Sequence, residues 1–339
     1  PNWYDTVRFS YKWRTNILES ITGVEQRGAL YTCPRHSLRY SLDFTDEAEA
    51  NWWYRTLFNY LHQLVGVPIW QDRTTLDSQA LAGQADLVCV STSNRNFEEG
   101  RPVIVIDSDD YTSYEVGEID SITGDTITLV SNLSSTWESG TDVYPLMAAT
   151  LESTQTTKNE TSGVASINIE ANSIMVDVPC QTAPVSEDGD FWPEALLPNW
   201  ASPIEFRTRH PYEVLRFLGV AAITSNWDIT KEGYRARFLL DGKSEIQTLV
   251  DFFNKMRGRW GSFYAPTWRS DVNVTASFSA SDTVITITDI EYLSDWLSRG
   301  GGQYLEFNFP DGTIVHRLVS NVLTPTTILL NTSIGKAIT

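Results

Sequence analysis

The chain has 339 residues, of which 41% are hydrophobic and 20% charged, proportions typical of a folded globular protein. Its 25 Lys and Arg against 43 Asp and Glu give a net charge of −18, which disfavours sequence-specific nucleic-acid binding because a negative surface repels phosphate. The apolar runs are shorter than the roughly 18 residues of a membrane helix, so we expect no membrane span and no signal peptide. The 12 Trp, 14 Tyr and 14 Phe indicate much surface to bury.

The sequence repeats itself at a spacing of 198 residues. At this spacing Tyr40 falls on Phe238, Glu47 on Glu245, Tyr54 on Phe252, Pro68 on Pro266 and Trp70 on Trp268, and Arg39, Leu42 and Asp43 fall on identical residues. A register that preserves so many residue types in order is typical of a duplication. The sequence therefore predicts two related units in tandem.

The first unit is expected to begin with strands and one helix. Residues 38–44 alternate apolar and polar side chains, as a half-buried strand does. A helix is predicted over residues 46–65, with Asp46 at its start and Gly66 at its end. Its apolar stripe is made of Trp53, Leu57, Tyr60, Leu61 and Leu64.

The second unit repeats this order. A strand is predicted around Tyr234–Phe238, followed by a helix over residues 244–257. Ser244 and Gln247 have the spacing of a capping box at the start of this helix. Gly258 is placed to end it as a left-handed cap.

A small β-module follows each helix. The predicted division is a first unit at 1–85, a module at 86–150, a connecting segment at 151–190 with exposed stretches at 152–161 and 186–190, a second unit at 191–272 and a second module at 273–339. Each unit combines a sheet with one packed helix. The expected fold class is mainly β with α (α+β), in two tandem copies.

The sequence predicts no catalytic, cofactor-binding or metal-binding residues, and we expect no enzyme. Phosphate-binding glycine loops and nucleophile elbows are absent from it. The acidic run Asp107–Asp110 favours a solvated turn over a calcium site, and Cys89 favours a buried thiol. The carboxylates that could suggest a glycosidase give no basis for choosing a pair; they are Glu98, Glu99, Glu115 and Glu118. The three cysteines and four histidines are scattered, which disfavours disulfide and zinc frameworks and fits assembly in a reducing cytoplasm.

The segment after the second helix is a candidate interface. Arg, Trp and Tyr are the residue types that dominate binding energy at protein interfaces. Arg257, Arg259, Trp260 and Tyr264 lie close together beside flexible glycines, and we predict an interaction surface there. Trp268 is expected in the core because it repeats Trp70.

Several patches resemble tail proteins of long-tailed bacteriophages and of gene transfer agents. They are Glu25–Leu30 with Pro34-Arg35, Gly140–Pro145, Leu197–Trp200, Gly219, Glu245–Phe253 and Arg257–Thr267. The resemblance implies a structural virion protein of the tail tip or baseplate, similar to distal tail or hub proteins. It also implies the β-sandwich-plus-helix fold of the tail tube, here duplicated, and no iron–sulfur cluster because the cysteines lie far apart.

The resemblance and the repeat together suggest a ring. Three duplicated chains would present six similar units, so we expect a trimer with pseudo-sixfold symmetry that joins the tail tube protein to hub or fibre proteins; a hexamer is the alternative. An acidic lumen would let DNA pass. Such a protein would be assembled in the cytoplasm of the host bacterium and reside in the virion. A carbohydrate-binding receptor adhesin and a cell-wall hydrolase are the rival interpretations.

Overall fold

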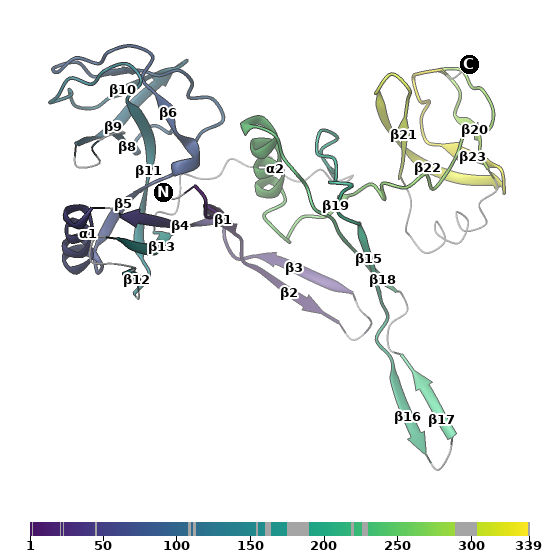
Figure 1. Cartoon of the computed structure of the whole chain (residues 1–339). Coiled ribbons are helices and arrows are strands. Elements are labelled where there is room, and N and C mark those ends of the chain that lie inside the picture. Colours follow the sequence, from purple (N-terminus) through teal and green to yellow (C-terminus); the bar gives the residue numbers. More distant parts are fainter. Residues whose placement is uncertain are drawn as a thin grey trace. The chain divides into compact units, whose positions relative to one another are not determined.

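A computed structural model gives the architecture of the chain (Figure 1). It describes residues 1, 3–20, 22, 24–44, 46–107, 110, 113–153, 155–159, 164–174, 190–217, 220–225, 230–288 and 304–337. In this part of the chain strands dominate and two α-helices are present, which confirms the expected mainly β, α+β class. Residues 1–16, 28–183 and 242–260 form one compact unit, and residues 17–27, 184–241 and 261–339 form the other. Each of the five predicted segments is one continuous stretch of sequence, whereas each compact unit combines separate stretches. The units therefore do not test the predicted boundaries, which stay a prediction.

Unit 1 is built on an antiparallel sheet in which strand β11 (Asp142–Leu151) joins two hydrophobic cores. One core lies around Leu38 and Trp70, and the other around Leu87 and Ile127. The main strand order is β1-β4-β13-β11-β8-β9-β10-β7, with β12 paired to β13 and both β5 and β6 paired to β11. These strands are β1 (Arg8–Lys12), β4 (Arg35–Phe44), β5 (Leu64–Pro68), β6 (Thr74–Thr75), β7 (Asp86–Val88), β8 (Pro102–Ile106), β9 (Tyr114–Thr123), β10 (Thr126–Leu129), β12 (Thr156–Asn159) and β13 (Ala165–Ser173).

The two predicted β-modules have the same topology. The first is ordered β7-β10-β9-β8, and the second β20-β23-β22-β21, with every neighbouring pair antiparallel. The second module consists of β20 (Val284–Thr286), β21 (Tyr304–Asn308), β22 (Ile314–Thr324) and β23 (Thr327–Leu330). The register of the central hairpin shifts at Leu129 opposite Ile119 in one module and at Leu330 opposite Val319 in the other. Because such bulges are specific features of a fold, their recurrence supports the duplication.

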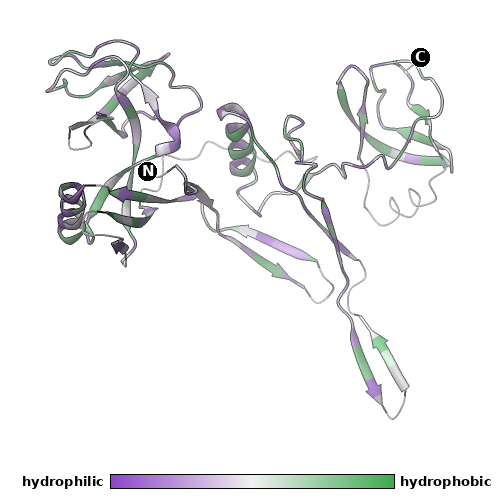
Figure 2. Cartoon of the chain, viewed as in Figure 1, coloured by the Kyte–Doolittle hydropathy of each residue, from purple (hydrophilic) through white to green (hydrophobic). Residues whose placement is uncertain are grey.

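Equivalent positions of the two modules are buried alike. Ile127 and Ile328 are both fully buried, as are Leu87 and Ile285, which are 198 residues apart. An isolated bridge joins Leu76 to Cys89 in the first module, and the bridge between Val274 and Ile287 lies 198 residues further along. The strands of both modules carry apolar stretches, which are green in Figure 2. The spacing found in the sequence therefore holds in three dimensions.

A nested hairpin also occurs twice, and sequence reasoning missed it. Strand β1 pairs with β4, and the chain between them forms the hairpin β2 (Thr15–Glu19) and β3 (Glu25–Ala29). In the second copy β15 (Glu205–Arg209) pairs with β18 (Lys231–Arg235), and the hairpin β16 (Glu213–Phe217) and β17 (Val220–Thr224) lies between them in sequence.

An edge-on aromatic pair occurs in each copy, between a residue that precedes the helix in sequence and a tryptophan that follows it. The rings of Tyr40 and Trp70 are 5.8 Å apart at 69°, and those of Phe238 and Trp268 are 6.0 Å apart at 63°. Trp70 lies at η1 (Trp70–Asp72) and is buried, whereas Trp268 is only half-buried. The core position expected for Trp268 is therefore only partly reached.

Helix α1 (Glu47–Tyr60) is shorter than predicted. The Asp46 side chain accepts a hydrogen bond from the backbone of Ala48, which confirms the predicted start. Gly66 does not end the helix, because it lies in strand β5, which pairs with β11. Trp53 and Leu57 pack against the core, but Tyr60 and Leu64 are exposed, so the predicted stripe is wrong at its end.

Helix α2 (Lys243–Lys255) begins at Gly242, and its predicted capping box is wrong. Ser244 lies inside the first turn, where its carbonyl accepts a hydrogen bond from Thr248 Oγ1. Gly258 has a φ of +68°, as predicted for a left-handed cap. A Cβ atom there would lie 2.6 Å from Trp13, so glycine is required for both reasons.

The predicted connection at 151–190 contains a buried strand. Ile167 and Ile169 of β13 are almost fully buried, and β13 pairs with both β4 and β11. Apolar and polar residues alternate along β13, with Ala165, Ile167, Ile169 and Ala171 on its apolar side. This alternation indicates a strand, but polar residues on both sides of it in the sequence made it hard to recognise. The acidic stretch 186–189 lies outside the described residues. The short strands β14 (Asp190–Phe191) and β19 (Phe263–Tyr264) pair in parallel in unit 2.

Shared core positions predict matched effects on stability. We expect Ile127→Ala and Ile328→Ala each to lower the free energy of unfolding of its module by about 2–5 kcal/mol, because each leaves a cavity in a fully buried place. Urea unfolding followed by circular dichroism measures this. Thr123→Ala and Thr324→Ala, at exposed equivalent positions, are the controls and should change stability by less than about 0.5 kcal/mol. A large effect in one module and none in the other would contradict the shared core.

Candidate interaction surface

Three of the four predicted interface residues lie together, at the end of α2 in unit 1. The guanidinium of Arg257 lies 5.2 Å from the centre of the Trp260 ring, and Arg257 has a φ of +49°. Arg259 is exposed, and Trp260 is partly so. A cation over an indole face forms a pre-arranged contact surface of the type that interfaces use.

Tyr264 belongs to unit 2, where it lies in an aromatic cluster. Its ring is 5.5 Å from Phe191 and 4.5 Å from Tyr304, and Phe191 stacks on His316 at 4.2 Å. A hydrogen bond with His316 lowers the pKa of Glu306, although burial opposes this shift. Tyr264 therefore holds together its own unit, and the structure does not place it with the other three predicted residues.

Glu115 is one of the carboxylates considered for glycosidase chemistry, but its hydrogen bonds indicate a structural role. It accepts hydrogen bonds from the backbone of Ser134 and Ser135 and from the indole of Trp137. Burial raises the pKa of Glu115, but these hydrogen bonds outweigh it and the pKa is lowered. A general acid in a glycosidase needs the opposite shift, so this carboxylate is suited to fixing its loop.

Metal and thiol chemistry find little support in the described part of the chain. No group of three or more His, Cys, Asp and Glu there is arranged to hold a metal ion. Residues 108 and 109 of the acidic run that could suggest calcium lie outside the described residues, as does Cys180. Burial raises the pKa of the Cys89 thiol to about 12, which makes it a poor nucleophile near neutral pH.

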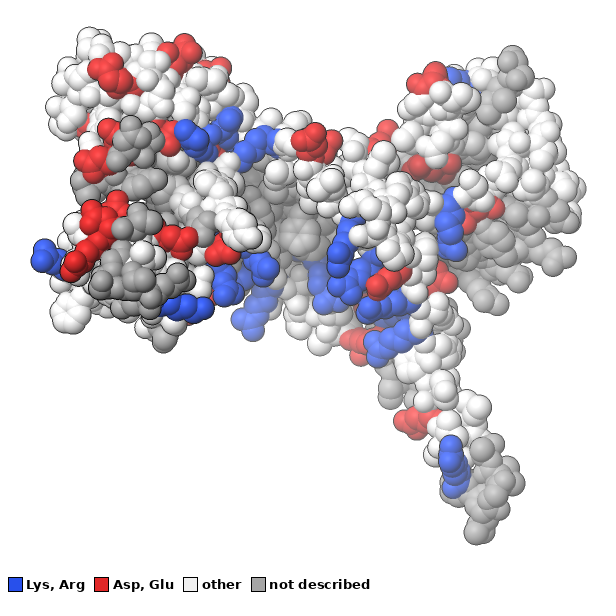
Figure 3. Space-filling view, viewed as in Figure 1, with Lys and Arg blue, Asp and Glu red and all other residues white. Residues whose placement is uncertain are grey.

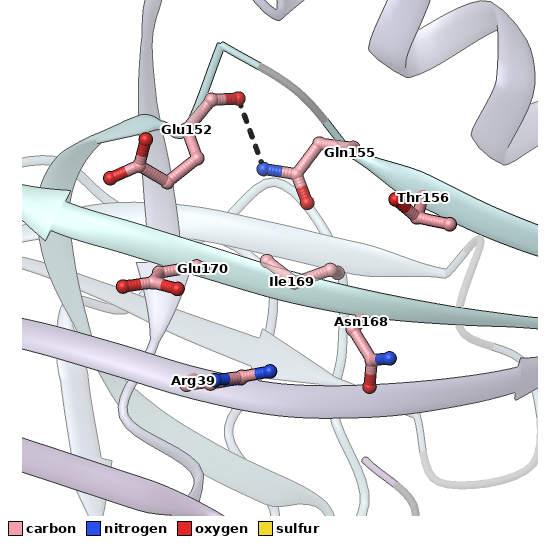
Figure 4. Close-up of a pocket in the computed structure, with 7 residues that line it drawn as sticks. All are labelled: Arg39, Glu152, Gln155, Thr156, Asn168, Ile169 and Glu170. Atoms are coloured by element: carbon pink, nitrogen blue, oxygen red, sulfur yellow. Dashed lines mark hydrogen bonds between the residues drawn. The ribbon is translucent and has the colours of Figure 1, made fainter.

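A polar hollow of about 340 Å³ lies beside β4 and β13 (Figure 4). It is lined by Arg39, Glu152, Gln155, Thr156, Asn168, Ile169 and Glu170. Gln155 Nε2 donates a 3.1 Å hydrogen bond to the Glu152 carbonyl, and Glu170 lies directly opposite Arg39 on the neighbouring strand. The hollow offers one cation and two carboxylates in an open, shallow setting. It lacks the mainly apolar lining of most small-molecule sites.

Two like-charged pairs lie on one face of β1 and β4. Arg8 lies directly opposite Arg39, and Lys12 directly opposite Arg35. All four side chains are exposed, and Arg35 also lies over the Tyr31 ring. Like charges directly opposite each other destabilise a sheet. This basic face could have been predicted from the sequence, because residues two apart on a strand point to the same side. That spacing places Arg8, Ser10 and Lys12 on one face of the first strand, and Arg35, Ser37 and Arg39 on one face of the second.

A similar pair in the second copy is already neutralised. Arg209 lies opposite Lys231, and Lys231 Nζ donates 2.6 Å hydrogen bonds to both Glu19 and Glu25 of the β2–β3 hairpin, which also belongs to unit 2. Hydrogen bonds from Lys231 and Arg27 lower the pKa of Glu25 to about 2. Blue side chains gather over β15 and β18, whereas the first module shows mainly red ones (Figure 3).

Comparison with known proteins gives no family for this chain: no family model matches it, and no curated protein is significantly similar. Within the described residues, neither α-helix is long and apolar enough to span a membrane.

Glu19 and Glu25 both bind Lys231, and we call this pair of carboxylates the clamp. The clamp predicts that the stability of unit 2 depends on pH. Because the pKa of Glu25 is depressed, its ion pair stabilises unit 2 fully above pH 4.5, and this contribution is lost as the pH falls through about 2. We expect Lys231→Gln to raise the pKa of Glu25 towards 4.5, measured by NMR titration of the side-chain carboxyl group. Lys336→Gln, which removes the partner of Asp311, should leave Glu25 unchanged. An unchanged Glu25 pKa in Lys231→Gln would contradict the clamp.

Proposed function

We propose that this protein is a structural virion component of a bacteriophage tail tip or baseplate. In this proposal it forms a ring that joins the tail tube to hub or fibre proteins and lets DNA pass. It is assembled in the host cytoplasm and acts without catalysis or cofactor. The sequence patches that resemble tail proteins motivate the proposal.

The observation that carries it is the duplication. The β-module, the nested hairpin and the edge-on aromatic pair each occur twice with the same topology. A duplicated chain lets three molecules present six similar surfaces, which suits a joint between a sixfold tube and threefold parts. A trimer with pseudo-sixfold symmetry is therefore favoured over a hexamer.

The exposed aromatic side chains support an assembling protein. Trp3, Phe58, Trp200 and Tyr212 are each more than half exposed, and Phe58 is 89% exposed. Exposed apolar groups of this size are favoured where another protein covers them. A closed ring needs heterologous contacts, in which two different surfaces of each chain meet.

The alternative function is a carbohydrate-binding receptor adhesin of the baseplate. An adhesin of this type would expose coplanar tryptophans on one β-module. In the first module Trp137 is buried and donates its indole hydrogen to Glu115. The described residues therefore offer this alternative no specific support.

The mass in solution tests the proposal. Light scattering at several protein concentrations should give three times the chain mass of 38.2 kDa. Six times this mass would keep the ring but remove the trimeric joint. A strict monomer at every concentration, including after addition of the neighbouring tail proteins, would contradict the ring.

A further inference from the structure

In each copy the outer strands of the nested hairpin, β1 with β4 and β15 with β18, end in a pair of basic residues. The two pairs occupy the same place in the fold. Lys12 and Arg35 form the last pair of β1 and β4 before the chain enters its inner hairpin. Arg209 and Lys231 form the last pair of β15 and β18 at the corresponding point. Both copies therefore have two cations opposite each other at the same place in the topology.

The two pairs differ in what neutralises them. Lys231 holds two carboxylates, Glu19 and Glu25, each at 2.6 Å. Within the described residues, neither Lys12 nor Arg35 has an ion pair with a carboxylate, and both are exposed. The adjacent pair of Arg8 and Arg39 adds two further exposed cations to the same face, although Arg39 also lies opposite Glu170 of β13.

This basic face is costly for an isolated chain. Cations directly opposite each other on a sheet repel, and the effect grows when four lie on one face. The second copy shows how this repulsion is relieved, because its pair binds two carboxylates from another hairpin. An equivalent pair of carboxylates would relieve it in the first copy.

The chain itself carries a surface of the opposite sign. Residues 86–150, which contain the first module, have 12 Asp and Glu against 2 Lys and Arg, a net charge of −10. On β9, Glu118 and Asp120 lie on the same face and both are exposed. Residues two apart on a strand are separated by about 7 Å, a spacing that two neighbouring cations can match.

We propose that the basic face formed by Arg8, Lys12, Arg35 and Arg39 binds the acidic face of β9, with Glu118 and Asp120, in a second copy of this chain. The inference deepens the proposed function, on which it rests, because it names the two surfaces of the ring contact. Contact between unlike faces is the heterologous arrangement that a ring requires. A net charge of −18 disfavours the competing occupant, nucleic acid.

Charge reversal tests the inference on the full-length chain. We expect Lys12→Glu with Arg35→Glu to weaken self-association at least tenfold at low salt, measured by light scattering across a concentration series. Adding Glu118→Lys and Asp120→Lys to the same chain should restore association, because the charges are exchanged and still complementary. Association of the wild type should weaken as salt is raised.

A matched control separates this contact from a general charge effect. Arg55→Glu with Lys158→Glu changes the net charge equally at exposed sites on α1 and β12 of the same unit, and it should leave association unchanged. Far-UV circular dichroism verifies folding of every variant. If the glutamate variant does not fold, Lys12→Gln with Arg35→Gln should still weaken association.

The outcomes distinguish the inference from the ring proposal. A wild-type oligomer that is unaffected by the reversal at Lys12 and Arg35 overturns the inference and leaves the ring standing. A DNA duplex that binds the wild type but not this variant would assign the face to phosphate and also overturn it. Failure of the wild type to oligomerise, alone or with neighbouring tail proteins, contradicts the ring itself.

Discussion

The edge-on contact between an aromatic residue before the helix and a tryptophan after it in sequence is the constraint that both copies of this protein retain. It joins Tyr40 to Trp70 and Phe238 to Trp268 at nearly the same distance and angle. In each copy the contact brings together chain segments that precede and follow the helix in sequence. Because aromatic pairs prefer edge-on geometry and large buried areas, one such contact can fix the order of the elements around it. The cores around this contact can then differ between the two copies while the order of the elements stays the same.

The two copies keep one topology but differ in their surfaces. In the modules, bulges and buried apolar positions recur, since these determine whether the sheet can close over its core. At the hairpins, a basic pair recurs, yet among the described residues only the pair at Lys231 has carboxylates bound to it. Such a difference is expected when one copy makes its contact within the chain and the other is left to make it with a neighbour.

Much of the fold could be predicted from the sequence. The repeat spacing and the strand periodicity gave the fold class and the order of helix and module, because both depend on local patterns. Helix ends and the strand β13 could not be predicted as well. Gly66 resembles a helix terminator but is held in β5 by pairing with β11, and Ile167 is buried by strands distant in sequence. Such tertiary pairing overrides local signals.

The candidate surface was harder to predict for the same reason. Arg257 and Trp260 are close in sequence and do meet, whereas Tyr264 is drawn into a cluster with Tyr304, which no local pattern reveals. The basic face depends on the register of β1 against β4, which places Lys12 opposite Arg35. The two-residue spacing of the basic residues shows that those of each strand share a face, but the pairing across the two strands depends on a register that the hairpin as a whole fixes.

Electron microscopy of the assembled protein tests the central claim most directly, that a duplicated chain builds a ring. The account predicts threefold particles in which each chain contributes two similar lobes, so that six lobes surround one axis. Open chains of molecules that never close would contradict the ring, and particles with six complete chains around the axis would keep the ring but contradict the trimer.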